Sequence, residues 1–317
     1  MNSTFKKLAK LIKKAKSIAI FTHISPDCDA LGSSLPLMLA LRELNKEADI
    51  YIEDELTYSE KLIFDETLIK NGPCNPDNYD LMISTDVPKI KRLGIYGNTF
   101  VSFQNRIVLD HHKNEDTVGN YYYINTELSS CSEITYELIK ALKVKITKQM
   151  ATYLYAGLSS DTYSFMNTNV SKNSFRVALE LLNLGVDVDF INEKLYKTKT
   201  EKEVFLTGYL WSNFVIENDI AYCLIDYATL TKLDASKTDC DSFSPELLCI
   251  DGVNKSFSLI ETEPGLFNLS LRCKKNGDVR IVAEKLGGGG HLGASGAKFN
   301  AKNIEEAKKM VLAAFNK

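Results

Sequence analysis

The sequence has 317 residues, which is enough for about two domains of ordinary size. Hydrophobic residues make up 44% and charged residues 25%, a balance that is typical of a folded globular protein and excludes a largely disordered chain. The formal net charge of −3 excludes a protein that binds long duplex nucleic acid through an overall positive charge, so any contact with nucleic acid must use a few local cations.

The seven cysteines are scattered and form no CxxC pair, which argues against a disulfide framework and against a zinc–thiolate site. We therefore expect a reduced, cytoplasmic protein. Residues 1–16 place lysines among apolar residues at helical spacing and predict an amphipathic helix packed on the first domain. A helix lying on a membrane surface is the weaker alternative, because the apolar face is short. No segment resembles a signal peptide or reaches the roughly 20 apolar residues of a membrane span.

Residues 1–190 alternate short apolar runs with helical patterns, which predicts an α/β fold built on a parallel sheet with strands buried on both faces. The runs that favour strands are 17–22, 39–44, 80–84 and 106–109. Helical spacing follows at 151–158 and 174–184, with Gly185 placed to end the second of these helices.

Residues 191–215 are rich in Lys and Glu and predict a helical connector. Residues 216–317 predict a smaller α+β domain, and its strand-like runs are 220–225, 256–261 and 267–272, followed by a helix at 304–315. We expect the active site to lie in the cleft between the two domains.

The first chemical pattern is FTHISPDCDALGSS, in which His23, Asp27 and Asp29 come directly after a predicted strand and before a helix. Open α/β sheets bind ligands at the carboxyl ends of their strands. The two aspartates would repel each other unless a cation lay between them, so the pattern predicts a metal site. The alternative is an aspartate that caps the helix beside an unrelated histidine.

Further candidates follow later apolar runs. Asp86 comes after one such run, where an aspartate is by itself more often a turn former. Asp110, His111 and His112 end another, and two adjacent imidazoles suit a metal ligand and a proton donor. Asp161 lies at the end of a helical pattern, where its charge opposes the helix dipole, so a positive partner is expected.

The second domain contains LGGGGHLGASG, in which Gly288, Gly289 and Gly290 precede His291. Glycines let backbone N–H groups approach an anion closely, which predicts a phosphate-binding turn with His291 as an added donor. A flexible linker is the alternative. Arg272, at the end of a predicted strand, supplies a fixed cation for a phosphate.

The first-domain candidates offer nitrogen and oxygen ligands without a thiolate, a set that suits Mn²⁺, and next Mg²⁺ or Co²⁺, better than structural zinc. Two ions held about 3.5 to 4 Å apart are able to support an in-line phosphoryl displacement. Two histidines and four aspartates, one of them shared by both ions, are enough to hold such a pair.

These patterns resemble the DHH/DHHA1 phosphoesterase superfamily, and within it the compact oligoribonuclease and pAp-phosphatase proteins called nanoRNases. The resemblance rests on HISPDCDALGSSL, on Asp86 followed by RLG, on DHHK, on SSCSE, on SSDTYSF, and on SLRC with GGGGHLGASG. It covers nearly the whole chain, and the pairing of DHHK with GGGGH is its most specific part.

The resemblance implies that His23, Asp27 and Asp86 hold one metal ion, and that a second is held by Asp29, Asp86, His111 and Asp161. Asp86 would bridge the two ions and share the catalytic role with His112, which would contact the reacting phosphate. Asp110 would orient the histidine pair. Arg272, the three glycines and His291 would bind a substrate phosphate, and the resemblance is compatible with a homodimer.

Two departures from the family pattern concern structure and specificity. Pro36 interrupts the helix after the first pattern and predicts a kink that costs roughly 3 kcal/mol unless it is compensated. Tyr163 stands where relatives usually carry a small residue, which bears on substrate preference.

The implied activity is removal of nucleotides from very short RNA, with hydrolysis of the 3′-phosphate of pAp. Hydrolysis of cyclic di-AMP or its product pApA is an alternative that the same site would serve. A pyrophosphatase is disfavoured by GGGGH and SLRC, and a nucleotide or RNA binder with an inactive site is disfavoured because no ligand is missing.

Overall fold

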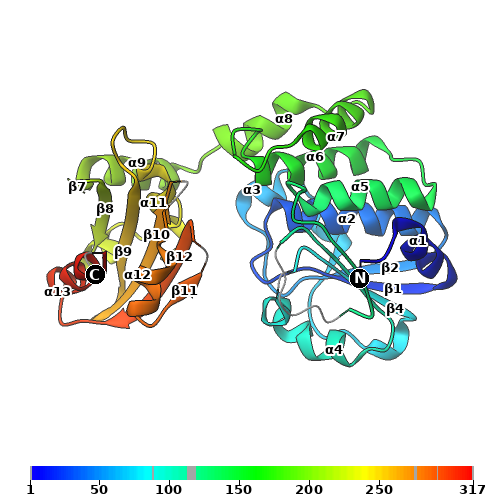
Figure 1. Cartoon of the computed structure of the whole chain (residues 1–317), viewed down its shortest axis with the longest axis horizontal. Coiled ribbons are helices and arrows are strands. Elements are labelled where there is room, and N and C mark those ends of the chain that lie inside the picture. The colour runs from blue at the N-terminus through cyan, green and yellow to red at the C-terminus, as the bar shows by residue number, and fades with distance from the viewer. Residues whose placement is uncertain (1, 88, 113–118, 275–276, 291, 316–317) are drawn as a thin grey trace. The chain divides into compact units, whose positions relative to one another are not determined.

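The computed structural model of the chain describes residues 2–87, 89–112, 119–274, 277–290 and 292–315. The chain divides into two compact units, Met1–Thr198 and Lys199–Lys317, each with its own sheet and core (Figure 1). None of the helices in the described residues combines the length and the apolar character needed to cross a bilayer.

Unit 1 is built on a six-stranded sheet in the order β3-β2-β1-β4-β5-β6, in which every neighbouring pair is parallel. The strands are β1 Ser17–Phe21, β2 Glu47–Tyr51, β3 Ile69–Lys70, β4 Leu81–Thr85, β5 Arg106–Asp110 and β6 Tyr121–Ile124. The strand order reverses between β1 and β4. A doubly wound sheet opens a crevice for ligands at this point, outside the carboxyl ends of its strands.

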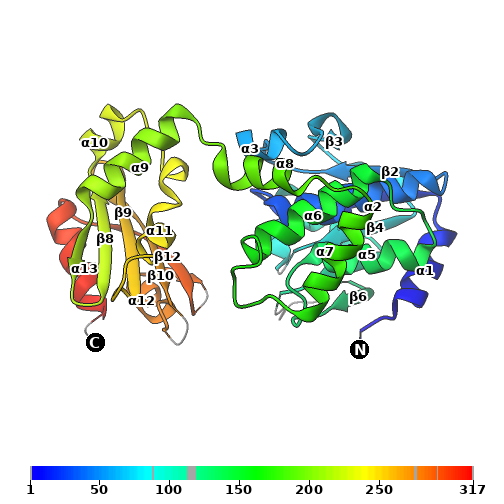
Figure 2. The same ribbon diagram turned by 90° about the horizontal axis from the view of Figure 1, so that it is seen from above.

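Both faces of this sheet are covered (Figures 1 and 2). Ile18 and Ile20 of β1 pack into the core that α1, α2, α5 and α6 share, whereas Phe21 packs on the other face with Tyr96 and Phe100. The helices are α1 Phe5–Lys14, α2 Cys28–Glu43, α3 Tyr58–Lys61, α4 Gly97–Ser102, α5 Cys131–Leu142, α6 Lys148–Thr162, α7 Lys172–Asn183 and α8 Val188–Asn192. Short 3₁₀ turns lie at Glu66–Leu68, Pro76–Asn78 and Ile90–Tyr96, and a π turn at Glu193–Lys197.

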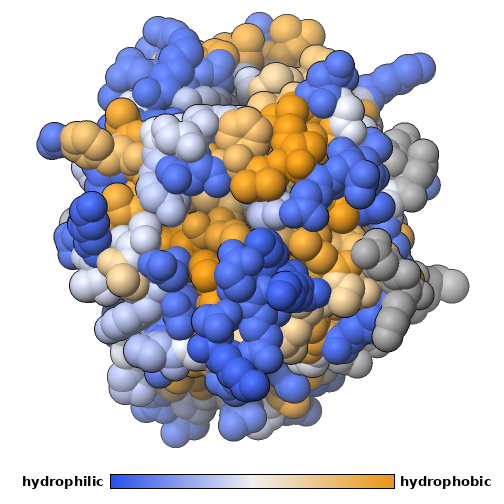
Figure 3. All heavy atoms as spheres, turned by 90° about the vertical axis from the view of Figure 1, so that its left-hand side faces the viewer, coloured by the Kyte–Doolittle hydropathy of each residue, from blue (hydrophilic) through white to orange (hydrophobic). Residues whose placement is uncertain are grey.

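Unit 2 contains a mixed sheet in the order β11-β12-β10-β9-β8-β7, in which only β8 and β9 run parallel. Its strands are β7 Val215–Glu217, β8 Ile220–Ile225, β9 Lys255–Glu263, β10 Leu266–Cys273, β11 Gly289–Gly290 and β12 Ala294–Asn300. Its helices are α9 Glu201–Asn213, α10 Tyr227–Lys232, α11 Phe243–Leu247, α12 Arg280–Lys285 and α13 Ile304–Phe315, with a 3₁₀ turn at Thr238–Cys240. Figure 3 shows that apolar and hydrophilic side chains alternate in small patches over one face of the molecule.

The predicted fold class is confirmed: a parallel α/β sheet comes first and a smaller α+β unit follows. α1 is the predicted amphipathic helix and buries Leu8 and Ile12. Pro36 lies inside α2, which the structure shows as one helix from Cys28 to Glu43.

Two expectations are wrong. Residues 39–44 are not a strand but belong to the end of α2 and the residue after it. Nearly every residue of α2 up to Leu41 is buried, and a helix that is apolar all round shows no helical period in its sequence. The segment 191–215 is not one helix, because α8 and the π turn end before Thr198 and α9 begins at Glu201, with Leu206 buried in the core of unit 2.

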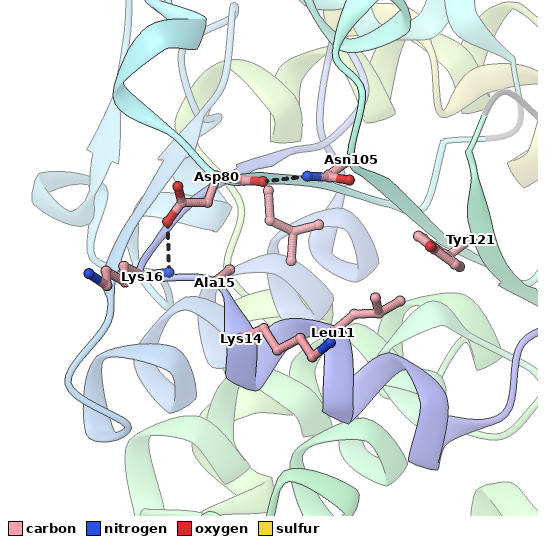
Figure 4. Close-up of a pocket in the computed structure, with 8 residues that line it drawn as sticks. Leu11, Lys14, Ala15, Lys16, Asp80, Asn105 and Tyr121 are labelled. Atoms are coloured by element: carbon pink, nitrogen blue, oxygen red, sulfur yellow. Dashed lines mark hydrogen bonds between the residues drawn. The ribbon is translucent and has the colours of Figure 1, made fainter.

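A hollow of about 440 Å³ lies at the amino ends of β1 and β4 (Figure 4). Its polar wall is Asp80, whose carboxylate accepts from the Lys16 N–H at 2.8 Å and whose carbonyl accepts from the Asn105 amide at 3.2 Å. The predicted ligands follow the carboxyl ends of the same strands, so this hollow lies at the opposite edge of the sheet from them.

Candidate metal centre

All six predicted metal ligands come together beside the point where the strand order reverses. The groups are His23 with Asp27 and Asp86, Asp29 with His111 and Asp161, and Asp86 with His111 and His112. Within each group one ligand atom per residue lies within 4.8 Å of the others. Asp86 and His111 each belong to two of these groups.

His23 follows β1 and is 5% exposed. Its Nε2 lies 3.6 Å from Asp86 Oδ2 and 3.7 Å from Asp27 Oδ2. Its Nδ1 lies 2.9 Å from the Ile24 carbonyl oxygen. When Nδ1–H donates to that carbonyl, the lone pair of Nε2 points at the two carboxylates, which is the tautomer that a metal ligand requires.

The RLG segment holds the loop that carries His23. The Arg92 carbonyl accepts from the Ile24 N–H at 2.7 Å, and the Arg92 guanidinium lies 2.8 Å from His23 Nδ1. Gly94 has a φ of 56°, and a Cβ there would lie 1.8 Å from Glu53 Oε2. A side chain at this position is therefore excluded, which explains the glycine by packing and not by chemistry.

Asp27 serves as helix cap and candidate ligand at once. Its Oδ1 accepts from the N–H groups of Asp29 and Ala30 at 3.0 Å, which caps α2. Its Oδ2 is left to face His23. The helix-cap interpretation therefore holds for this residue, and its second oxygen is left for the metal-site interpretation.

Asp29 is fully buried in the first turn of α2 and is held by the start of α5. Its Oδ2 accepts from the Cys131 N–H at 2.6 Å, and its Oδ1 accepts from the Ser132 N–H at 2.9 Å and the Ser132 hydroxyl at 2.6 Å. Carboxylates are stabilised at helix N-termini by such donors and by the helix dipole. Two serines lie at the start of α5. Ser130 caps the helix, whereas the Ser132 hydroxyl reaches the site.

Two glycines let α2 and α6 cross closely enough to build this arrangement. A Cβ at Gly32 would lie 2.6 Å from the Tyr153 carbonyl oxygen. A Cβ at Gly157 would lie 2.1 Å from Ser132 Oγ and 2.9 Å from Asp29 Oδ1. Sequence reasoning missed Gly157, although a glycine one helical turn before Asp161 was a visible signal of close packing.

Asp86 follows β4 with a φ of 59°, a left-handed conformation that costs about 1 kcal/mol or more for a residue with a side chain. Its Oδ1 lies 3.4 Å from His111 Nε2 and 3.2 Å from His112 Nδ1. Its Oδ2 faces His23. The strained backbone thus points one carboxylate at all three histidines of the site.

The two histidines after β5 differ in their partners. His111 Nε2 lies 3.1 Å from Asp161 Oδ2 and 3.7 Å from Asp29 Oδ2. His112 donates its backbone N–H to Asp110 Oδ1 at 2.9 Å, and its Nδ1 lies 3.0 Å from the same oxygen. With Nδ1–H donated to Asp110, the Nε2 of the partly exposed His112 side chain is available to another molecule.

The pKa values of the site reflect an excess of carboxylates. Burial and the nearby Asp161 and Asp86 raise the pKa of Asp29 well above its usual value. Burial alone lowers the pKa of His111, but Asp161 and Asp86 raise it to about 12. Burial likewise lowers the pKa of His23, which Asp27 and Asp86 raise to about 10. The potential that favours protons on these imidazoles equally favours a divalent cation.

Burial would raise the pKa of Asp86, yet His111, His112 and His23 lower it well below its usual value. Burial, offset by His111, raises the pKa of Asp161 to about 6. Asp86 Oδ1 and His111 Nε2 are buried and have no hydrogen-bond partner among the described residues. Buried polar atoms need a partner, so the residues present fit a bound metal ion.

Asp161 lies at the end of α6, as the sequence predicts, and its backbone carbonyl accepts from the Asn167 and Asn169 amides at 3.0 and 3.1 Å. The chain then turns through Tyr163, Ser164 and Phe165, all with positive φ. Each such position costs about 1 kcal/mol for a residue other than glycine.

In unit 2, Arg272 on β10 pairs with Ala294 of β12, and Gly290 of β11 pairs with the next residue, Ser295. Arg272 and Gly290 therefore lie on β10 and β11, the two strands on either side of β12. Burial lowers the pKa of Arg272, whose Nη1 donates to the Leu271 carbonyl at 2.9 Å. His291 lies outside the described residues.

The glycine run is only partly free to bind an anion. The Gly288 N–H donates to the Ala283 carbonyl at 2.8 Å and so ends α12. A Cβ at Gly288 would lie 2.1 Å from the Gly296 carbonyl oxygen, whereas Gly289 has open space where its Cβ would be. Close packing on β12 therefore explains Gly288, and Gly289 is the position with room for a ligand.

Comparison with known proteins agrees with this site. Residues 17–158 match the model of the DHH family, N-terminal domain. The chain is 28% identical over 308 residues to a bifunctional oligoribonuclease and PAP phosphatase NrnA of Thermus thermophilus, covering 97% of this chain and 92% of that protein. It is 28% identical over 297 residues to the Bacillus subtilis protein of the same name, covering 92% and 91%.

A solved structure is similar over the same length. It is an exopolyphosphatase-related protein from Bacteroides fragilis, with a TM-score of 0.92 and 28% identity over 98% of this chain and 95% of that one. The matched region 17–158 contains the segments after β1, β4 and β5, whereas Asp161 lies just beyond it. The chain is therefore similar to the DHH family N-terminal domain over residues 17–158, and to the named relatives over nearly its whole length.

Proposed function

We propose that the chain is a metal-dependent phosphoesterase that degrades very short oligoribonucleotides to 5′-mononucleotides and removes the 3′-phosphate of pAp. The observation that carries this proposal is the cluster of histidines and aspartates at the topological switch point, with buried ligand atoms that have no hydrogen-bond partner among the described residues. The names of the Thermus thermophilus and Bacillus subtilis relatives support the choice of substrates.

We assign one ion to His23, Asp27 and Asp86, and a second to Asp29, Asp86, His111 and Asp161. The mixed nitrogen and oxygen donors favour Mn²⁺, with Mg²⁺ or Co²⁺ as substitutes. When bound, two such ions neutralise charge on the phosphate oxygens and lower the pKa of a coordinated water.

The chain's own residues orient the remaining groups. Asp110 accepts from the Nδ1 side of His112, so Nε2 is the atom that donates a proton to the leaving oxygen. Asp86 Oδ1 lies 3.2 Å from the same Nδ1, so both carboxylates face one nitrogen of the ring and not Nε2. Because Asp110 is fully buried and bonded to the His112 backbone as well, the imidazole has little freedom to rotate.

Arg272, Gly289, Gly290 and His291 are assigned to a phosphate of the substrate, with Gly288 supporting the turn. A fixed phosphate pocket favours short substrates, because it measures the distance from the reacting phosphate to a chain end. A catalytic domain at 1–190 and a substrate-binding domain at 216–317 belong to this proposal, as do a cytoplasmic location and a homodimer.

The test compares kcat/KM of the purified protein with Mn²⁺ on pNpN dinucleotides, longer oligoribonucleotides, pAp and cyclic di-AMP, because kcat/KM defines preference. We expect pNpN and pAp to be hydrolysed and the rate on RNA to fall as its length increases. Asp86→Asn, which removes a charge shared by both groups of ligands, should abolish turnover. If Mn²⁺-loaded protein leaves both pNpN and pAp intact, the proposal is wrong.

Two other outcomes have separate meanings. A preference for cyclic di-AMP or pApA would keep the chemistry and change the substrate. Binding of nucleotides without turnover by any divalent ion would identify an inactive binder.

A further inference from the structure

Tyr163 is an exposed aromatic residue two positions after the candidate ligand Asp161. Its side chain is more than half exposed, at 54%, and its backbone has a φ of 47°. Glycine is the residue that this conformation favours. The ring is largely exposed and the end of α6 uses only the backbone N–H of this residue, so burial does not explain why a tyrosine stands here.

A second tyrosine holds this ring in place. The ring of Tyr163 packs edge to face against Tyr196, with centroids 5.3 Å apart and planes at 84°. Tyr196 is itself fixed, since its hydroxyl donates to the Ser159 carbonyl oxygen of α6 at 2.6 Å. An edge-to-face contact uses one edge or one face of a ring, so a flat ligand still has a face of Tyr163 to stack on.

The tyrosine pair adjoins the metal centre. Burial raises the pKa of Tyr196 to about 12, with smaller contributions from the Cys28 thiol and the Tyr163 phenol, while contacts with Ser159 and Ser164 lower it. Cys28 lies between Asp27 and Asp29 at the start of α2. Tyr163 comes two residues after Asp161, and Tyr196 is hydrogen-bonded to Ser159, two residues before it. The pair therefore lies beside the end of α6 that supplies this candidate ligand.

We propose that Tyr163, held by Tyr196, is a stacking platform for one nucleobase of the substrate. This inference rests on the proposed function, because a phosphoester held at the metal centre places the attached nucleoside within a few ångströms of it. Stacking on an aromatic ring accepts any base, since every base has a flat face. The platform would favour substrates that carry a base next to the reacting phosphate over phosphoesters without one.

The experiment is a double-mutant cycle in which the Tyr163 ring is removed from the protein and one base is removed from the substrate. Wild-type protein and Tyr163→Gly are assayed with Mn²⁺ on pApA and on two analogues, each lacking the base of one nucleotide. We expect wild-type KM to be about tenfold or more lower for pApA than for one of the analogues, within the range known for base–aromatic stacking. Tyr163→Gly should remove most of this difference, and Tyr163→Phe should keep it.

Two measurements separate stacking from a structural effect. Glycine suits the left-handed position, so Tyr163→Gly should unfold at the wild-type temperature or above it. Tyr227→Ala removes another exposed tyrosine, on α10 of unit 2, and should leave the KM ratio unchanged. If Tyr163→Gly keeps the wild-type KM ratio, the platform is refuted although the hydrolase proposal stands. If no variant hydrolyses pApA or either analogue, the proposed function itself fails, and the platform with it.

Discussion

Replacing Gly157 by alanine tests whether the crossing of α2 and α6 sets the geometry of the metal centre. The new Cβ would lie 2.1 Å from Ser132 Oγ and 2.9 Å from Asp29 Oδ1, far inside van der Waals contact. Either α6 moves away from α2, or the Ser132 hydroxyl rotates away from Asp29. Both responses weaken the hydrogen bond of 2.6 Å that fixes this carboxylate.

The magnitude follows from three effects. Overpacking of a tight contact costs about 1–3 kcal/mol. Loss of a hydrogen bond to a charged group costs about 1.5–3 kcal/mol. Alanine returns about 1 kcal/mol of helix propensity, because Gly157 lies inside α6. We therefore expect Gly157→Ala to lower the free energy of unfolding by about 1.5–5 kcal/mol and, since Asp29 loses its anchor, to weaken Mn²⁺ binding about 10- to 100-fold.

The assay is calorimetric titration of Mn²⁺ into the purified variant, with urea unfolding of the same preparation. Gly208→Ala is the matched control, because Gly208 lies inside α9 with no atom within 4 Å of its Cβ position. The control should gain up to about 1 kcal/mol of stability and bind Mn²⁺ as the wild type does. Wild-type Mn²⁺ affinity in a folded Gly157→Ala variant would refute the assigned role of the crossing.

The remaining predictions concern a proton donor and a surface ion pair. His112→Asn should lower kcat by about 10²- to 10⁴-fold, because it removes the proton donor. The Mn²⁺ affinity should stay within a few-fold of wild type, because Asp110 and not a metal ion contacts Nδ1 of His112. A loss of Mn²⁺ affinity as large as that of Asp86→Asn would identify His112 as a metal ligand instead. The hydrogen bond from Tyr136 lowers the pKa of Glu180 from its usual 4.5 to about 2. Burial acts in the opposite direction, and Lys140 and Arg176 lower the pKa further. Glu180→Gln should therefore be less stable than wild type by about 1 kcal/mol or less. The full difference should be present above pH 4.5, and it should vanish as the pH falls towards 2. Urea unfolding at pH 7 and pH 3 measures it, and an equal difference at both values would contradict the assignment.

The sequence predicts those parts of the site that depend on strand ends. Parallel strands finish at one edge of their sheet, so His23, Asp86 and His111 come together whenever β1, β4 and β5 are adjacent. A short apolar run followed by a polar residue is enough to identify such a position. The three strands were correctly placed to within one residue, and the residues after them converge as expected.

Features that depend on how helices pack were not predictable in the same way. Residues 39–44 were predicted as a strand because α2 is buried on nearly all sides. A helix buried in this way has no polar face, so its sequence lacks the helical period. Gly157 by itself signals close packing, but Ser132 lies on another helix, so the local patterns do not show which residue Gly157 approaches. The left-handed turn after Asp161 was also not predictable from the sequence, because tyrosine, serine and phenylalanine seldom adopt a positive φ.

Asp29 shows how helix packing determines the position of a candidate metal ligand. It is the one candidate ligand that is completely buried and bound on both oxygens by another helix, so its position is set by α5 and not by the sheet. The start of α5 in turn stays where it is only while Gly157 lets α6 pass. Substitutions that shift this crossing by a few tenths of an ångström should therefore change metal affinity before they unfold the protein, because a ligand carboxylate tolerates less displacement than a hydrophobic core does.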